Sequence, residues 1–312
     1  MAASRITAVR SRFRPALAIP YVLSARLTSL PPSSVFRHMT PSEWYWLSVH
    51  GERTFPSLHG YLPSLPPEEI QVRFTGTHSE DTLREAFAFY QIVSRETRGG
   101  HPRSAVDFGC GWGRITRFFI KDFGKDGLLG VDPIEGMIDL CRSSNPWATF
   151  EQIDLFPPLD LPSASVDVIF AFSVFSHLTE EVHLQWLAEF ARVLRPGGSL
   201  IVTTRERDFI LDCAAIREQE NDLTSVSKFR RIGTVGARSA FLDTQGALER
   251  YDAGEYCCDP IGAGEDLPSA TYGETAIPFA YVQRRWPPNF RVVEFLDAVP
   301  GVKQNIIVAR RT

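Results

Sequence analysis

The sequence predicts an α/β fold with a doubly wound, largely parallel sheet, and two observations support this prediction. A short apolar run at residues 105–108 leads into alternating glycines and then into helical spacing at 114–123. Helical patterns at 77–97 and 180–194 accompany further apolar runs that we interpret as strands. Those runs are 127–132, 148–154, 166–172 and 199–204. Strands that alternate with helices are typical of a parallel sheet covered on both faces.

The segment 104–114, SAVDFGCGWGR, is the strongest indication of a ligand site. Its glycines Gly109, Gly111 and Gly113 can adopt positive φ and allow another group to approach the backbone, which predicts a tight turn against a ligand. A dinucleotide fingerprint would need glycine at position 114, where Arg114 stands, and no P-loop Lys-Ser or Lys-Thr pair follows. The remaining pattern is an acid, Asp107, followed by three alternating glycines.

With this pattern the chain resembles the class I S-adenosylmethionine-dependent methyltransferases of the small-molecule type. A second motif, SVFSHLTEEVHLQWLAEFARVLRPGGSLIVTT at 173–204, looks like the unit between the fourth and fifth strands of that family. Two apolar runs, 290–295 and 305–310, look like the antiparallel pair that ends its sheet. The resemblance covers roughly 77–205 and 280–312. It implies a Rossmann-like seven-stranded sheet with S-adenosyl-L-methionine as cofactor.

The resemblance also implies which residues hold the cofactor. Asp132 ends the second strand, 19 residues beyond Gly113, where an acid can accept both ribose hydroxyls. An aspartate before Pro133 is equally suited to cap a helix, and the two roles are compatible. The expected cofactor contacts from the first two strand ends are Asp107, Gly109, Cys110, Gly111, Gly113, Asp132 and Pro133.

The third and fourth strands are expected to contribute further contacts. In the resembled family an acid at the position of Asp154 bonds the adenine amino group, and the next backbone N–H, that of Leu155, meets the ring. A carboxylate accepts from an amine but cannot pair with a keto group, so this contact would select adenine. Asp160 is a rival for the role. Ser173, at the end of the fourth strand, is expected to border the transferred methyl group.

His177 is the candidate general base, because its ordinary pKa near 6.5 suits proton removal around neutrality. A role in shaping the pocket is the alternative. The segment 173–176 replaces the motif that grips planar amines in nucleic-acid and glutamine N-methyltransferases. No Pro-Cys nucleophile occurs, and Ser173 offers no carboxylate for a divalent metal. These absences favour metal-independent methyl transfer to a hydroxyl of a small molecule, such as a secondary metabolite or a sugar-like acceptor.

Several alternatives to this function stay open. N-methylation of a small molecule is close to the favoured hypothesis. The chain could also bind the cofactor without turnover, as a partner protein, or be a dehydrogenase with an unusual glycine loop. Neither the identity of the acceptor nor the oligomeric state follows from the sequence.

The chain divides into four predicted parts. Residues 1–76 form an irregular and helical extension, 77–205 the cofactor-binding core, 206–285 an insertion that caps the acceptor, and 286–312 the strand pair that completes the sheet. The insertion is longer than an ordinary connection. Candidate acceptor contacts are aromatic and acidic: Phe175, Tyr251, Tyr256, Tyr272 and Glu274. Buried aromatic rings that hold the insertion on the sheet are the alternative interpretation.

Composition excludes several classes of protein. The 312 residues carry a net charge of −4 without a long basic run, which argues against a nucleic-acid partner. Five cysteines without a C-x-x-C pair favour a reducing, cytoplasmic location over a disulfide framework or zinc site. The sequence contains no run of 18 apolar residues, so we expect no membrane span. Residues 1–42 contain six arginines and no acid, which is compatible with an organellar transit peptide or a basic arm.

Overall fold

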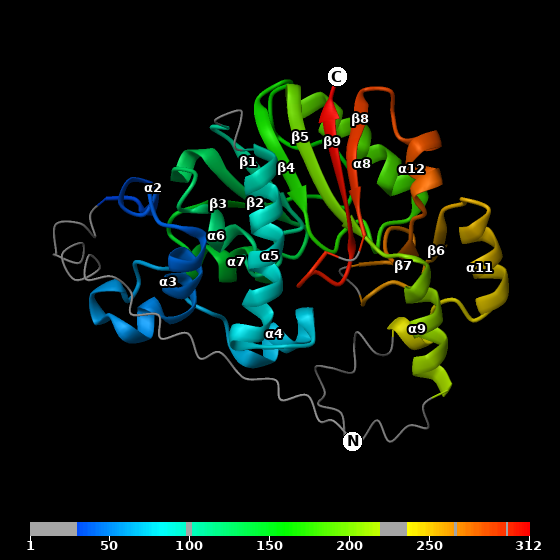
Figure 1. Cartoon of the computed structure of the whole chain (residues 1–312), viewed down its shortest axis with the longest axis horizontal. Coiled ribbons are helices and arrows are strands. Elements are labelled where there is room, and N and C mark those ends of the chain that lie inside the picture. Colours follow the sequence, from blue (N-terminus) through cyan, green and yellow to red (C-terminus); the bar gives the residue numbers. More distant parts are fainter. Residues whose placement is uncertain (1–29, 98–101, 219–235, 265–266, 298) are drawn as a thin grey trace, which may run out of the picture.

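The computed structural model describes residues 30–97, 102–218, 236–264, 267–297 and 299–312. Its core is a seven-stranded sheet with the strand order β3-β2-β1-β4-β5-β9-β8 (Figure 1). The strands are β1 (Ala105–Phe108), β2 (Leu128–Asp132), β3 (Thr149–Gln152), β4 (Val166–Ala171), β5 (Leu194–Thr204), β8 (Phe290–Leu296) and β9 (Asn305–Arg311). The predicted Rossmann-like sheet is confirmed.

The direction of the strands locates the site. β1 pairs in parallel with β2 and with β4, so the strand order reverses at β1. β9 runs antiparallel to β5, and β8 antiparallel to β9, as predicted for the last two runs. In such sheets ligands bind beyond the carboxyl ends of the strands at the reversal point. That edge carries the glycine segment.

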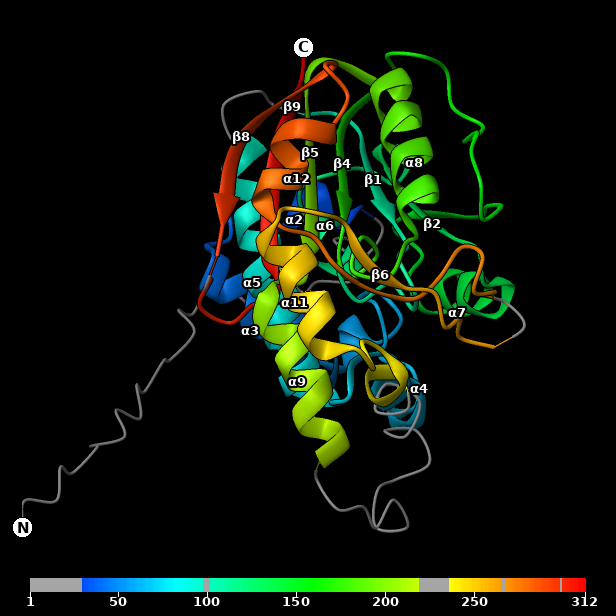
Figure 2. The same cartoon turned by 90° about the vertical axis from the view of Figure 1, so that its right-hand side faces the viewer.

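Helices cover both faces of the sheet, and Figure 2 shows α5 and α8 on opposite sides of it. Val168 and Phe170 of β4 face the cluster that contains α5, whereas Ile169 and Ala171 face the cluster that contains α8. This alternation with period two buries both faces of the strand. The helices of the core are α5 (Ser79–Thr97), α6 (Thr116–Phe119), α7 (Glu135–Ser144) and α8 (Glu180–Val193), with the short 3-10 helix η2 (Lys125–Gly127).

The described part of the N-terminal extension packs on the α5 side of the sheet. Its elements are α2 (Pro32–Val35), α3 (Pro41–Thr54), η1 (Pro56–Leu58) and α4 (Glu68–Thr75). The Trp44 indole N–H donates to the carbonyl of Phe118 at 2.9 Å, and the Trp147 indole N–H donates to the carbonyl of Tyr61 at 2.5 Å. The extension is therefore tied to the core by the buried Trp44 and the half-buried Trp147. Residues 1–29, which carry most of the proposed transit peptide, lie outside the described residues.

The insertion has a small core of its own. It contains α9 (Arg207–Glu218), α11 (Thr244–Asp252), β6 (Cys257–Asp259), β7 (Glu274–Ala276) and α12 (Phe279–Arg285). β6 and β7 form a separate antiparallel pair. Isolated bridges join Leu178 to Tyr272 and Arg205 to Ala276, so the insertion is attached at the carboxyl edge of the sheet. Residues 219–235 of the predicted insertion lie outside the described residues.

Two predicted elements differ from the structure. The helix predicted at 114–123 is reduced to α6, because the indole of Trp44 takes the Phe118 carbonyl that a longer helix would use. The turn predicted at 194–198 lies inside β5, which pairs Val166 with Leu194 and then shifts register before Ser199. The extra residues form a bulge there.

In the described residues no helix is long and apolar enough to cross a bilayer. All five cysteines are free.

Candidate functional site

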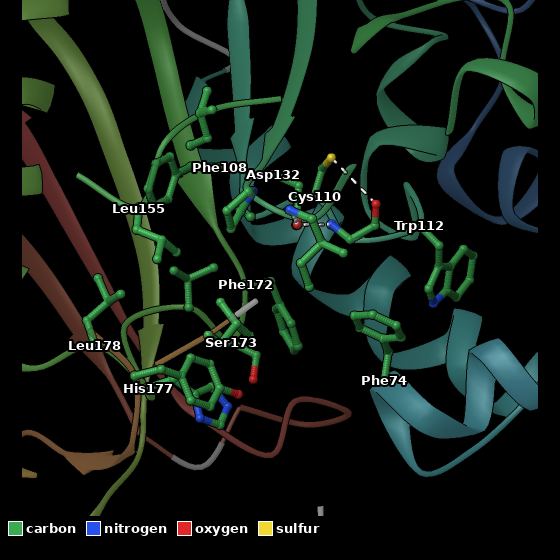
Figure 3. Close-up of a pocket in the computed structure, with 18 of the residues that line it drawn as sticks. Phe74, Phe108, Cys110, Trp112, Asp132, Leu155, Phe172, Ser173, His177 and Leu178 are labelled. Carbon is green, nitrogen blue, oxygen red and sulfur yellow. Dashed lines mark hydrogen bonds between the residues drawn. The ribbon is translucent and has the colours of Figure 1, made fainter. Parts of the chain in front are cut away.

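A cavity of about 220 Å³ opens at the carboxyl edge of the sheet, between β1 and β4 (Figure 3). Strand ends form one wall, and α4 and the insertion contribute the others. Residues named by the sequence analysis that line it are Gly109, Cys110, Gly111, Asp132, Pro133, Asp154, Leu155, Ser173, His177 and Tyr272. The structure thus brings together residues from four strand ends and from the insertion.

All three glycines of the turn have positive φ, but a Cβ at each would meet different surroundings. A Cβ on Gly109 would lie 2.3 Å from a methyl group of Val174, and one on Gly113 would lie 3.3 Å from Cys141 Sγ. A Cβ on Gly111 would meet only a ring carbon of Phe74, at 3.9 Å. Only Gly111 is therefore needed to keep space free on the cavity side, and the other two permit tight internal packing.

Asp132 joins two backbone segments at the cavity. Its Oδ2 accepts from the N–H of Gly111 at 2.8 Å, and its Oδ1 accepts from the N–H of Ile134 at 3.0 Å. The first of these bonds is drawn in Figure 3. Burial raises the pKa of the Asp132 carboxyl, and the two backbone N–H groups oppose that rise. Each carboxylate oxygen keeps a lone pair for a ligand, so the structural and ligand-binding roles are compatible.

Asp154 and Leu155 follow β3 at the rim of the cavity. The indole N–H of Trp186, from α8, donates to the Leu155 carbonyl at 3.1 Å and so anchors this loop. The Asp154 side chain is exposed. The loop therefore presents a carboxylate and a backbone edge beside an aromatic wall, a combination suited to a planar base with an exocyclic amine.

Ser173 occupies a strained position, with φ of 59°. Its N–H donates to Thr203 Oγ1 at 2.7 Å, and its Oγ accepts from Gln304 Nε2 at 3.0 Å. The Thr203 hydroxyl in turn donates to Gln304 Oε1 at 2.6 Å. A non-glycine residue persists in the left-handed region only when its surroundings hold it there. Sequence reasoning missed Thr203, which lies in β5, and Gln304, which immediately precedes β9.

Both ring nitrogens of His177 are engaged. Nδ1 lies 2.9 Å from the carbonyl of Gly273, so Nδ1 must carry the proton and donate. Nε2 is then the acceptor for the Arg205 guanidinium at 3.2 Å. Burial, together with the charge of Arg205, lowers the pKa of His177 well below its ordinary value. The only lone pair of the ring is therefore occupied, which does not support the expected role of general base.

The insertion supports His177 from behind. The ring of Tyr272 stacks on that of His177, with centroids 4.6 Å apart and planes 7° apart. Arg205 forms a buried ion pair with Glu274. The Arg205 guanidinium also lies over the ring of Phe209, 3.9 Å from its centroid. Glu274 therefore neutralises Arg205, and its Oε2 also lies 3.5 Å from His177 Nδ1, behind the cavity wall.

Other predicted site residues lie away from the cavity. Asp107 is buried in β1 and accepts from the Thr116 hydroxyl at 2.5 Å. Burial raises its pKa to about 7. The remaining positions outside the lining are Gly113, Phe175, Tyr251, Tyr256 and Glu274. Phe175 packs edge-on against His183 in the core, and the Tyr256 hydroxyl donates to the Leu178 carbonyl at 2.9 Å. These rings hold the insertion on the sheet, as the alternative interpretation proposed.

Arg114 is the one cationic side chain among the described residues that line the cavity. Its Nη1 donates to the carbonyl of Thr82 at 3.2 Å and to Glu85 Oε2 at 3.3 Å. Its guanidinium lies 4.8 Å from the ring centroid of Phe172. Burial lowers its pKa. Sequence reasoning used Arg114 only to exclude a dinucleotide motif, although its place after the last glycine already positioned it beside the ligand.

The described residues contain no group of three His, Cys, Asp or Glu side chains arranged to hold a metal ion. The cavity combines backbone open to a ligand, two carboxylates, one arginine and apolar walls. This arrangement can bind and orient a nucleoside-like molecule beside a second, less polar compound.

Known proteins with similar sequences are described as methyltransferases. Residues 105–198 match a family model described as a methyltransferase domain. Trans-aconitate 2-methyltransferase of Rhizobium leguminosarum bv. trifolii is 35% identical over 102 residues, which are 32% of this chain and 38% of that protein. A probable S-adenosylmethionine-dependent methyltransferase of Mycolicibacterium smegmatis is 32% identical over 147 residues, which are 47% of this chain and 54% of that protein.

The chain also aligns with solved structures. The crystal structure of an S-adenosylmethionine-dependent methyltransferase from Mesorhizobium loti aligns with a TM-score of 0.43 and 15% identity, over 73% of this chain and 98% of that one. The sequence matches span about two fifths of the Rhizobium protein and about half of the Mycolicibacterium protein.

Proposed function

We propose that the chain is an enzyme that moves a methyl group from S-adenosylmethionine to an oxygen atom of a small molecule. The match of residues 105–198 to a methyltransferase domain supports this proposal. The observation that carries the proposal is the Asp132 carboxylate. It holds the glycine turn in place and keeps free lone pairs at the cavity, at the point where the strand order reverses.

The cofactor would be held by its three polar parts. The ribose hydroxyls would meet Asp132, and the adenine amino group would meet Asp154 beside the Leu155 backbone. The α-carboxylate of the methionine part needs a positive partner, and Arg114 is the only cation among the described lining residues. Gly111 would leave room for the sulfonium chain.

The bound cofactor supplies an electrophilic methyl group, so the protein chiefly has to align the acceptor with it and exclude water. Ser173 borders that position and is held by Gln304 and Thr203. His177 shapes the acceptor side and keeps its proton on Nδ1. Among the described residues of the cavity wall, no imidazole nitrogen has an unoccupied lone pair. This favours an acceptor that can be methylated without a histidine to remove its proton.

The acceptor end of the cavity is largely apolar. Val174, Leu178 and Leu267 line it, together with the hydroxyl-bearing Thr271 and Tyr272. These groups suit a small molecule with an apolar face and one or two polar positions. The favoured target is a hydroxyl. A carboxylate oxygen is the second candidate, because the Rhizobium relative is named for methylation of trans-aconitate, and a carboxylate needs no base.

The test has two stages. The purified chain would first be titrated by calorimetry with S-adenosylmethionine, S-adenosylhomocysteine and NADH. We expect micromolar binding of the first two and none of NADH. Binding of NADH alone would reject the proposal in favour of a dehydrogenase.

Labelled methyl transfer would then be measured with panels of hydroxylated metabolites, small carboxylic acids including trans-aconitate, and amines. Transfer to an amine alone would reject the oxygen assignment and leave N-methylation. Cofactor binding without transfer to any panel would favour a non-catalytic binding protein.

A further inference from the structure

A second cavity, of about 420 Å³, lies at the opposite edge of the sheet from the cofactor site. Its walls come from residues 37–41, from the carboxyl end of α5, from residues 102–103 just before β1, and from residues 119–123 at the end of α6. Figure 1 shows the end of α5 and the beginning of β1 at the upper edge of the sheet, whereas α4 and α9 lie below. The two cavities share no lining residue.

The lining of this cavity is strongly cationic. Arg37, Arg103 and Lys121 face one acid, Asp122. Lys121 Nζ donates to Asp122 Oδ1 at 2.7 Å, and the Tyr90 hydroxyl donates to Asp122 Oδ2 at 2.7 Å. Asp122 therefore neutralises Lys121, although each of its oxygens keeps one further lone pair.

Unlike Lys121, the two arginines have no ion-pair partner among the residues that the structure describes. Both side chains are exposed, and neither forms an ion pair with any acid in the described ranges of the chain. They belong to separate segments, since Arg37 lies in the extension and Arg103 at the beginning of the core. Two guanidinium groups on one cavity attract an anion and can donate in pairs to oxyanions.

The floor of the cavity is apolar and well packed. Tyr90 and Phe119 meet edge to face with ring centroids 4.9 Å apart, and Phe119 and Phe123 are 6.1 Å apart. Phe119 also stacks on Phe170 of the sheet, at 4.5 Å. The three rings are 6% exposed or less, so this floor keeps its shape without a ligand. The apolar lining residues that are more exposed are Met39, Pro41 and Pro102, and they favour a small apolar body.

We propose that this cavity is a second ligand site, which binds a small organic anion. The anionic head, a phosphate monoester or a carboxylate, lies between Arg37 and Arg103, and an apolar body lies against Met39, Pro41 and Pro102 above the aromatic floor. The inference is independent of methyl transfer, because none of its residues lies at the cofactor cavity.

The test is calorimetric titration of the full chain in a buffer without phosphate. Phenyl phosphate, benzoate and inorganic phosphate are the probes, because they separate the charge of the head from the apolar body. We expect phenyl phosphate to bind about tenfold more tightly than inorganic phosphate, which lacks the ring. If benzoate binds more tightly than phenyl phosphate, the head is a carboxylate. No binding of either aromatic anion at millimolar concentration overturns the proposal.

Variants then locate the binding. The double variant Arg37→Ala, Arg103→Ala keeps the backbone N–H of residue 103, which donates to Asp167 at 2.7 Å, so we expect it to fold. Its affinity for the better aromatic anion should fall about tenfold or more. Arg291→Ala, which removes an exposed arginine from β8, is the matched control and should bind as the parent does. Unchanged affinity in the double variant, or an equal loss in the control, contradicts the assignment.

Discussion

Replacement of Asp132 by asparagine tests the centre of the proposed cofactor site. The side chain keeps its size and one carbonyl oxygen but loses its charge and one acceptor. In the parent, each carboxylate oxygen already accepts one backbone N–H, from Gly111 and from Ile134. Each oxygen has one more lone pair, so the carboxylate can accept both ribose hydroxyls. The amide can accept only one of them.

The expected loss of binding follows from this count. A hydrogen bond to a charged group contributes about 1.5–3 kcal/mol. Loss of one such bond, with weakening of the other, corresponds to roughly tenfold to a hundredfold weaker binding of the cofactor. The amide NH2 of Asp132→Asn also has to face one of the two backbone N–H donors, which costs about 1–3 kcal/mol of folding stability. Relief of the buried charge offsets part of that cost.

Two measurements separate these effects. Calorimetry with S-adenosylhomocysteine gives the affinity, and urea unfolding without ligand gives the stability. Asp126→Asn, at an exposed position in η2, is the control and should change neither. If the Asp132→Asn variant is less stable but binds S-adenosylhomocysteine as tightly as the parent, Asp132 has only its structural role and the ribose assignment is wrong.

Four further variants address other residues. Gly111→Val places a branched side chain in the cavity at φ of 52°, so S-adenosylhomocysteine binding should be lost, and urea unfolding should show a cost of about 1–2 kcal/mol; unchanged affinity would remove the glycine turn from the site. Gln304→Leu removes the donor to Ser173 Oγ, and steady-state kinetics should show turnover about tenfold lower with the KM for the cofactor unchanged. His177→Gln should lower turnover without altering its dependence on pH, whereas loss of the acidic limb of the profile would restore the role of general base. His183 has a pKa lowered to about 3 by burial, so the unfolded chain takes up a proton below pH 6.5 that the folded chain does not, and stability is lost as the pH falls. Between pH 7.5 and 5.5 the free energy of unfolding of the parent should fall by about 1.4 kcal/mol through this group. Urea unfolding at both pH values should show a smaller fall for His183→Phe. Equal falls in both proteins would contradict the buried neutral state.

Several elements could be predicted from the sequence because the signals that define them are local. The apolar runs that became β1, β2, β4, β8 and β9 are short, and all but the last end at glycine, aspartate or serine, which marks both the strand and its carboxyl end. The helical periods of α5 and α8 are equally local. Their order along the chain predicts the doubly wound sheet.

Where tertiary contacts compete with local preference, the prediction was less accurate. α6 is shorter than its apolar pattern because Trp44, 74 residues away, takes the carbonyl of Phe118. The Pro-Gly turn before the fifth strand is part of β5 because Val166 pairs with Leu194. Neither partner can be identified from the affected segment itself.

The same division holds for the candidate site. The sequence by itself determined that a glycine turn and three acids would stand at strand ends, since side-chain type and spacing along the chain suffice for that. Only the tertiary structure decided that a Cβ at Gly111, unlike one at Gly109 or Gly113, would be free of close contacts, and that Asp107 is buried against Thr116.

Tertiary structure likewise decided the state of His177, whose lone pair is taken by Arg205, and the support of Ser173 by Gln304. Gln304 lies 131 residues from Ser173, and Gly273 lies 96 residues from His177. The physical reason is that a proton position and a strained backbone depend on partners brought together by folding, whereas strands and turns depend mainly on neighbours in the chain.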